Sequence, residues 1–148
     1  MSYLRFAAMI ATSVIVMFIL KYSNVYEWSH VYFSETRFYM ALMMGAAMAI
    51  IMLGYMLGMY KNRKINIGIF AGSAMFFLFT LWLLRSQATI EDVAWMKAMI
   101  PHHSIAILNS ERANLSDPRV QKLAQQIIES QRREIAEMQE LIRDLEGK

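Results

Sequence analysis

Hydrophobic residues form three long runs in the first part of the chain. The runs 3–22, 38–60 and 65–84 are each about twenty residues long and nearly free of charged side chains. A helix of about 20 apolar residues crosses the ~30 Å hydrocarbon core of a bilayer. The first run is followed by further spans and has no clear small-residue cleavage motif, so we interpret it as an uncleaved span. The pattern predicts a membrane domain, residues 1–84, with three transmembrane helices.

Residues 85–148 instead alternate apolar and polar positions with the spacing of amphipathic helices. Thr89, with an acid three residues later, is typical of a helix N-cap. Asp117 followed by Pro118 is typical of a second N-cap and first helical residue, and Gly147 of a helix end. The predicted helix limits are Thr89 and about Asn114, then Pro118 and about Leu145. The fold predicted for the chain is all-α, with an antiparallel two-helix hairpin after the three spans.

Charge gives the expected orientation. Residues 1–84 carry a net charge of +4, whereas residues 85–148 carry −1. Three cations cluster between Lys61 and Lys64, and short positive loops stay cytoplasmic. We therefore expect the N-terminus in the cytoplasm and the hairpin domain outside the bacterial inner membrane, in the periplasm. The hairpin domain has no basic patch for phosphates, so no nucleic-acid partner is expected.

Two further features of the membrane half lead to predictions. The connection 21–37 is rich in aromatic side chains, which favour the lipid headgroup level; His30 within it is either a solvated loop histidine or an auxiliary metal ligand. Gly54 and Gly58, and then Gly68 and Gly72, are spaced for close helix approach, and predict a tight hairpin of the second and third spans. Seven methionines in the second span are explained by helix packing or, alternatively, by a metal-conducting stripe.

The residues with the most distinctive chemistry lie in the hairpin domain. Met96, Met99 and His103 share one face of the first hairpin helix, and His102 borders that face. The apolar face of the last helix includes Met138 but is interrupted by Gln131 and Glu134, and a carboxylate there needs a partner. If the hairpin folds about residue 116 or 117, the opposing pairs are Met99 with Glu134, His103 with Gln131, and Met96 with Met138. This register is accurate to about one helical turn.

Thioether and imidazole together favour a soft metal. The set suits Cu(I), by extension Ag(I), and Cu(II) through imidazole and carboxylate. Zinc rarely takes thioether ligands, and the chain has no cysteine. A di-iron centre needs several inward Glu residues and Glu-x-x-His pairs, which this spacing excludes. The alternative is that both methionines are core and the histidines a polar boundary.

The motif Met96-Lys-Ala-Met-Ile-Pro-His-His103, with Glu111, Leu123-Ala-x-x-Ile127 and Gln131-x-x-Glu-Ile-x-x-Met138, resembles bacterial domain-of-unknown-function family three hundred and five over residues 89–145. The resemblance implies a ferritin-like helical bundle and an association with copper resistance. It also implies a metal site, and the membrane half resembles a membrane-anchored subgroup. The implied ligand candidates are Met96, Met99, His102, His103 and Met138, with Glu134 and Gln131 as ligands or outer partners.

We therefore expect a membrane-anchored periplasmic protein that binds copper ion, with lipid as one partner and a copper exporter or periplasmic copper protein as another. About 60 residues rarely form a stable core alone. Two hairpins are therefore expected to pair into a four-helix bundle, which makes a homodimer. No enzyme activity is expected, although cuprous oxidase activity is a third hypothesis. A structural or interaction membrane subunit without a metal role is the alternative from another class.

Overall fold

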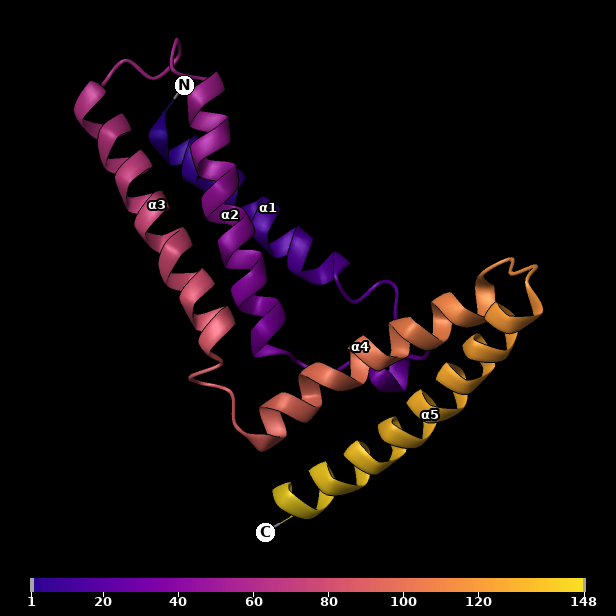
Figure 1. Ribbon diagram of the computed structural model, residues 1–148. Coiled ribbons are helices and arrows are strands. Elements are labelled where there is room, and N and C mark those ends of the chain that lie inside the picture. Colours follow the sequence, from indigo (N-terminus) through magenta and orange to yellow (C-terminus); the bar gives the residue numbers. More distant parts are fainter. Residues whose placement is uncertain (1, 148) are drawn as a thin grey trace. The chain divides into compact units, whose positions relative to one another are not determined.

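The computed structural model describes residues 2–147, and over these residues the chain is entirely helical, without strands. The helices in chain order are α1 (Tyr3–Leu20), η1 (Trp28–His30), α2 (Glu35–Tyr55), α3 (Arg63–Ser86), α4 (Asp92–Arg112) and α5 (Pro118–Glu146) (Figure 1). The all-α prediction is confirmed. The short 3₁₀ helix η1 was not predicted.

Three of these helices, α1, α2 and α3, are long and apolar enough to cross a membrane, judged by length and composition. They correspond to the three predicted spans. α3 begins two residues before its hydrophobic run because the Asn62 side chain accepts hydrogen bonds from the backbone N–H groups of Lys64 and Ile65. This cap satisfies donors that a helix start leaves without intrahelical partners.

The described chain divides into two compact units. The first unit joins the chain up to Lys21 to Thr36–Thr89, and the second joins Tyr22–Glu35 to the chain from Ile90 onward. Residues 22–35 therefore belong with the hairpin, although they lie between two membrane spans in the sequence. Each unit is described by itself below.

In the first unit, small residues bring α2 close to α1. Ala41, Gly45, Ala49 and Leu53 recur every four residues along α2 and are all buried. A Cβ atom at Gly45 would lie 2.3 Å from the Cγ2 atom of Val14 on α1. A side chain at this position would collide with Val14, so Gly45 allows α2 to pack closely against α1.

The predicted tight packing at the two Gly-x-x-x-Gly pairs is wrong. No atom lies within 4 Å of a Cβ built at any of the four glycines. The first pair cannot form a continuous helical face, because α2 ends at Tyr55 and Gly58 lies in the following turn. Sequence spacing cannot show which face of a helix meets its neighbour, and here the face containing Gly45 does so.

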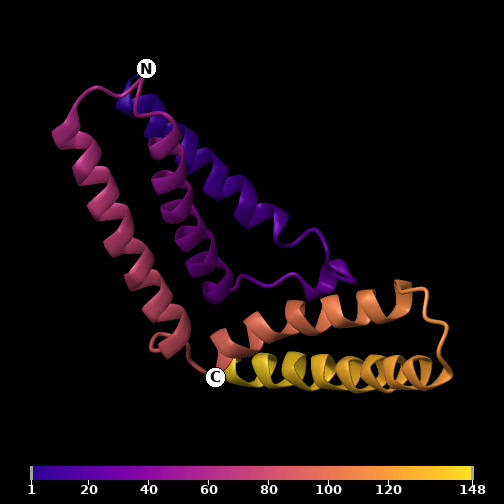
Figure 2. The same ribbon diagram turned by 45° about the horizontal axis from the view of Figure 1, so that its top comes forward.

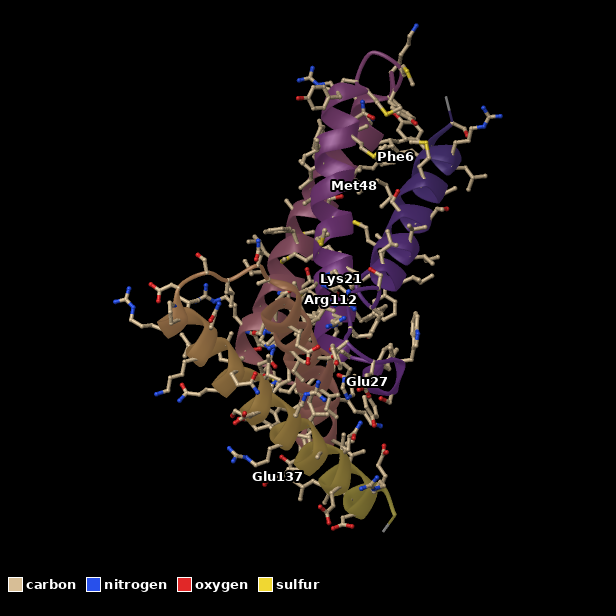
Figure 3. All side chains as sticks on the ribbon, turned by 90° about the vertical axis from the view of Figure 1, so that its right-hand side faces the viewer. Phe6, Lys21, Glu27, Met48, Arg112 and Glu137 are labelled. Atoms are coloured by element: carbon tan, nitrogen blue, oxygen red, sulfur yellow. The ribbon has the colours of Figure 1, made fainter. Side chains whose placement is uncertain are left out.

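A polar group of side chains ties the N-terminal ends of α1 and α3 together. The Tyr3 hydroxyl donates to Asn66 Oδ1 at 2.8 Å, and Asn66 Nδ2 donates to the Tyr60 carbonyl at 2.7 Å. Phe6 packs edge-on against the Tyr60 ring, with centroids 5.5 Å apart, and lies inward from α1 (Figure 3). Both the oxygen and the nitrogen of the buried amide therefore have a hydrogen-bond partner, as burial of a polar side chain requires.

In the second unit, α4 and α5 run antiparallel and side by side (Figures 1 and 2). The core between them consists of Met96, Ile100, Ile107, Ile135, Met138 and Ile142. Tyr26 and Tyr32, from the Tyr22–Glu35 segment, pack against this core as a third layer. The hairpin core is thus supplemented from within the same chain.

The helix limits of the hairpin differ from the prediction at one end. Asp117 accepts a hydrogen bond from the Arg119 N–H, Pro118 begins α5 and Gly147 follows its end, all as predicted. The predicted N-cap at Thr89 is wrong, because α4 begins at Asp92. The Thr89 hydroxyl instead lies 3.0 Å from the Tyr39 hydroxyl, and this contact within the first unit replaces the capping bond.

Candidate metal site

The face of α4 that contains the predicted ligands is directed into the hairpin. Met96 is 5% exposed and His103 is 9% exposed, and Met99 packs against the same core. These positions are spaced by three, four and seven residues, so they fall on one side of the helix. Pro101 is buried within α4, which continues through it from Asp92 to Arg112.

Both ring nitrogens of His103 have partners. Nδ1 lies 3.0 Å from the Met99 carbonyl oxygen, one turn earlier on the same helix. Nε2 lies 2.7 Å from Glu134 Oε2 on α5. Because a carbonyl oxygen only accepts, Nδ1 donates its proton there, and this fixes the ring orientation. Nε2 is then the nitrogen directed at the carboxylate.

Glu134 is held by a second partner on its own helix. The Ser130 hydroxyl donates to Glu134 Oε1 at 2.6 Å. Hydrogen bonds from Ser130 and His103 hold the pKa of the Glu134 carboxyl below its ordinary value. The carboxylate is therefore ionised at neutral pH and faces the imidazole as an anion.

Of the predicted thioethers, two come from opposite helices into one core. Met96 from α4 and Met138 from α5 belong to the same buried cluster, and Met138 is 7% exposed. Met99 is half-buried at the edge of this cluster. The structure therefore brings together Met96, Met99, His103, Glu134 and Met138 along the contact between α4 and α5.

The remaining two predicted residues lie at the border. His102 is exposed, and its ring centroid is 6.2 Å from that of His103. Gln131 is half-buried, one turn before Glu134. Within residues 2–147, no three His, Asp or Glu side chains gather closely enough to hold a metal ion without other donors. A metal at this site would therefore need donors in addition to His103 and Glu134, and the thioethers are the nearest candidates among the predicted ligands.

The predicted register of the hairpin is offset by one turn. Glu134 faces His103, whereas the prediction placed it opposite Met99. Two further pairs across the hairpin, Glu111–Arg132 and Lys97–Glu146, are displaced in the same direction. Val120 and Leu123, in the first turns of α5, are exposed. The predicted register assumed that the two helices start and end at the same level on either side of the loop. The loop 113–117 does not require this.

A second polar cluster, which the sequence did not predict, joins the Tyr22–Glu35 segment to the hairpin. Ser104 is fully buried, and its Oγ accepts a hydrogen bond from the Tyr26 N–H at 2.7 Å. The same oxygen lies 3.0 Å from His30 Nδ1. The interpretation of His30 as a solvated loop residue is wrong, since it is 9% exposed. Burial lowers the pKa of His30, and Arg132 adds to the effect while Glu27 opposes it.

Arg132, which is partly exposed, continues this polar cluster to the surface of the hairpin. Its guanidinium donates to Glu111 at 2.7 Å and to the Tyr26 hydroxyl at 3.1 Å, and it lies over the Tyr26 ring. A cavity of about 210 Å³ lies alongside, lined in part by Glu27 and His30. His30 Nε2 is 3.9 Å from Glu27 Oε2, on the side of this cavity. An auxiliary ligand role for His30 stays a prediction.

Sequence reasoning overlooked Ser104, Ser130 and Tyr26. The only signal for Ser130 is its place four residues before Glu134, on the same helical face. Nothing local marks Ser104 or Tyr26, because they meet across 78 residues of sequence.

Comparison with known proteins places the chain in a family. A family model described as Domain of unknown function (DUF305) matches residues 82–146, which include α4, α5 and all seven candidate residues. An uncharacterized protein of Acanthamoeba polyphaga mimivirus is 35% identical over 102 residues, covering 64% of this chain and 67% of that protein. No solved structure matches the chain. The chain therefore belongs to the DUF305 family.

Proposed function

We propose that the protein is a membrane-anchored copper-binding protein that binds Cu(I), and by extension Ag(I), between α4 and α5. The observation that carries this proposal is the His103–Glu134 pair, which lies beside a core with thioethers from both helices. Imidazole and thioether are the donors that suit Cu(I). His102 and Gln131 border the same site and are the auxiliary candidates.

The hydrogen bonds of His103 match those of a metal-binding histidine. Such residues donate one ring N–H to a carbonyl or carboxylate, which orients the other nitrogen toward the metal. In His103 the Met99 carbonyl takes the first role, and Nε2 is the nitrogen that faces Glu134 across the contact between the helices. Nε2 lies 2.7 Å from a Glu134 oxygen, so the imidazole and the carboxylate would approach a metal from opposite helices. Metal ligands bind in their deprotonated forms, so copper binding should weaken as the pH falls.

The proposed biological role follows from placement. With the positive turn at Lys61–Lys64 in the cytoplasm, the hairpin would face the periplasm of a bacterial inner membrane. A site there would buffer copper, or pass it to an exporter or periplasmic copper protein, in copper homeostasis or resistance. Binding and release are sufficient for this role, and no catalytic step is proposed.

The hairpin also supports a homodimer. Val120, Leu123, Leu141 and Leu145 are each at least 44% exposed, although all lie on the apolar side of α5. A second hairpin packed on this side would bury them and complete a ferritin-like four-helix bundle. The molecular mass of the particle in mild detergent tests this: a dimer is expected, and a monomer at micromolar concentration would contradict it.

A competition titration of the full-length protein with Cu(I) in detergent tests the proposed function. His103→Ala should weaken binding about 100-fold or more, since it removes a donor together with its orientation. Met96→Leu with Met138→Leu removes two thioethers at nearly constant volume, and should weaken binding at least about tenfold. Met75→Leu is the matched control, because Met75 lies exposed on α3, and should change nothing.

The alternative function is a structural membrane subunit without a metal. It is favoured by one observation, namely that both nitrogens of His103 already have partners within the protein. Unchanged Cu(I) affinity in both His103→Ala and the double Leu variant would support this alternative and end the copper proposal. Oxygen consumption with Cu(I) as the reductant would reveal cuprous oxidase activity, which we do not expect.

A further inference from the structure

The Tyr22–Glu35 segment has two chemically different faces. On one face Tyr26, His30 and Tyr32 are directed at the hairpin, through the Ser104 hydrogen bonds and the core contacts. On the other face Trp28 is 84% exposed, Phe33 is 62% exposed and Val31 is 40% exposed. The apolar and aromatic side chains of this segment are thus divided between a protein contact and an outward surface, and the sequence alone did not reveal this division.

The exposed apolar surface is costly in water. An indole exposed to this extent leaves most of its apolar surface uncovered, and burial of apolar surface is favourable in water. Trp28 is also the most exposed of the three tryptophans in the chain. A surface of this kind marks contact with another apolar phase or molecule.

The position of the segment in the chain indicates that the apolar phase in contact with these side chains is the lipid bilayer. The segment follows α1, which ends at Leu20, and precedes α2, which begins at Glu35, and both helices are candidate membrane spans. Phe33 is two residues before α2, so it lies within about 7 Å of its start at the maximum chain extension of ~3.5 Å per residue. By the same measure, Trp28 lies within roughly 25 Å of that start. The exposed side chains therefore cannot leave the neighbourhood of the bilayer.

We propose that Trp28, Val31 and Phe33 form a lipid-binding surface that sits in the headgroup region of the bilayer, while the opposite face of the same segment holds the hairpin. Tryptophan suits this region, because an indole has an apolar body and a polar N–H, and Val31 and Phe33 add apolar surface beside it. The segment thereby acts as a two-sided anchor. It would keep the candidate metal site near the membrane surface, and this role does not depend on which ion, if any, the site binds.

Tryptophan fluorescence in vesicles tests the proposal directly. The variant Trp82→Phe/Trp95→Phe retains Trp28 as the sole tryptophan, and both replaced residues are more than half exposed, so the fold should tolerate the changes. The full-length variant is reconstituted in phosphatidylcholine vesicles with bromine atoms on the acyl chains, either near the headgroup or near the chain end. Bromines near the headgroup should reduce Trp28 emission by about half, and those near the chain end much less.

Aqueous iodide gives the opposing measurement. We expect iodide to quench Trp28 weakly. Strong iodide quenching without bromine quenching would place Trp28 in water and overturn the proposal. Protection from both quenchers would indicate cover by protein, such as a second copy, and would also overturn it. The matched control retains only Trp82, which lies on α3 and should respond to bromine but not to iodide.

A second probe guards against a misfolded variant. The chain has no cysteine, so Phe33→Cys provides a single site for a nitroxide label. Membrane-soluble oxygen should relax this label more than a water-soluble nickel complex does. The reverse order would contradict the lipid contact independently of any tryptophan replacement.

Discussion

The two units of this protein use helices in opposite ways. Only 6% of the most apolar stretch of α1, and 6% of that of α3, is buried, so nearly all of this apolar surface faces outward. In α5 the exposed surface is largely charged, and the buried positions Ile135, Met138 and Ile142 form a narrow stripe. The contrast reflects two solvents, because lipid leaves apolar side chains outside whereas water drives them inward.

The contact between helices differs accordingly. α1 and α2 approach through small residues around Gly45, where dispersion and close fit are the available attractive forces. α4 and α5 bury aliphatic side chains and place the His103–Glu134 and Glu111–Arg132 pairs at the edge of that core. Close fit thus maintains the first unit, and hydrophobic burial with a few paired polar groups maintains the second.

The largest expected effect comes from filling the close contact of the first unit. Gly45→Val places carbon atoms where Val14 already lies, so we expect the free energy of unfolding in detergent to fall by about 3 kcal/mol, through overpacking. Gly54→Val on the same helix is the control and should change it by less than about 0.5 kcal/mol, since its surroundings are open. Unfolding by increasing SDS, followed by circular dichroism, measures both. If both variants lose the same unfolding free energy, the close contact of Gly45 with Val14 does not stabilise the first unit.

A somewhat smaller effect is expected from the polar contact of the second unit. Ser104→Ala leaves the Tyr26 N–H and His30 Nδ1 without their shared partner, so about 2 kcal/mol of stability should be lost. Ser110→Ala, at a half-buried position further along α4, serves as the control. Amide hydrogen exchange should show faster exchange of residues 22–35 in Ser104→Ala only. If these residues exchange at the parental rate, the segment is held by other contacts.

The smallest effect should be a pH dependence confined to the second unit. The folded state lowers the pKa of His30 from its ordinary value of 6.5, so the unfolded chain binds the proton more readily. Stability should therefore fall as the pH drops below about 6.5, and level off once the folded protein is protonated too. The Glu134 carboxyl also has a lowered pKa, so its contribution is present above its ordinary 4.5 and is lost at more acidic pH.

Single substitutions separate these two windows. His30→Asn should reduce the loss of stability that begins near 6.5. Glu134→Gln should reduce the loss below 4.5, to which Glu111 and Asp117 also contribute because their pKa values are lowered too. Thermal unfolding of the full-length protein at a series of pH values measures both slopes. A parental pH profile in His30→Asn would show that another group causes the first loss.

The sequence by itself determined the five long helices of this protein, although not the short helix η1. Span length and the absence of charge predicted three apolar helices, and Asp117-Pro118 with Gly147 predicted the limits of α5, since these signals are local. Helical periodicity also placed Met96, Met99 and His103 on one face, and Glu134 as a polar interruption of an apolar one. Local patterns of this kind survive folding because they depend on backbone geometry within a few residues.

Only the tertiary structure decided how these faces meet. It paired Glu134 with His103 one turn away from the predicted partner, and it selected Gly45 rather than the two Gly-x-x-x-Gly pairs for close approach. It also divided the side chains of the aromatic segment 22–35 between the hairpin and the outer surface. Within this segment, the Tyr26 N–H donates a hydrogen bond to Ser104, which lies 78 positions later in the sequence. Register, helix rotation and long-range contacts depend on how side chains of different elements fit together, and no single element contains that information.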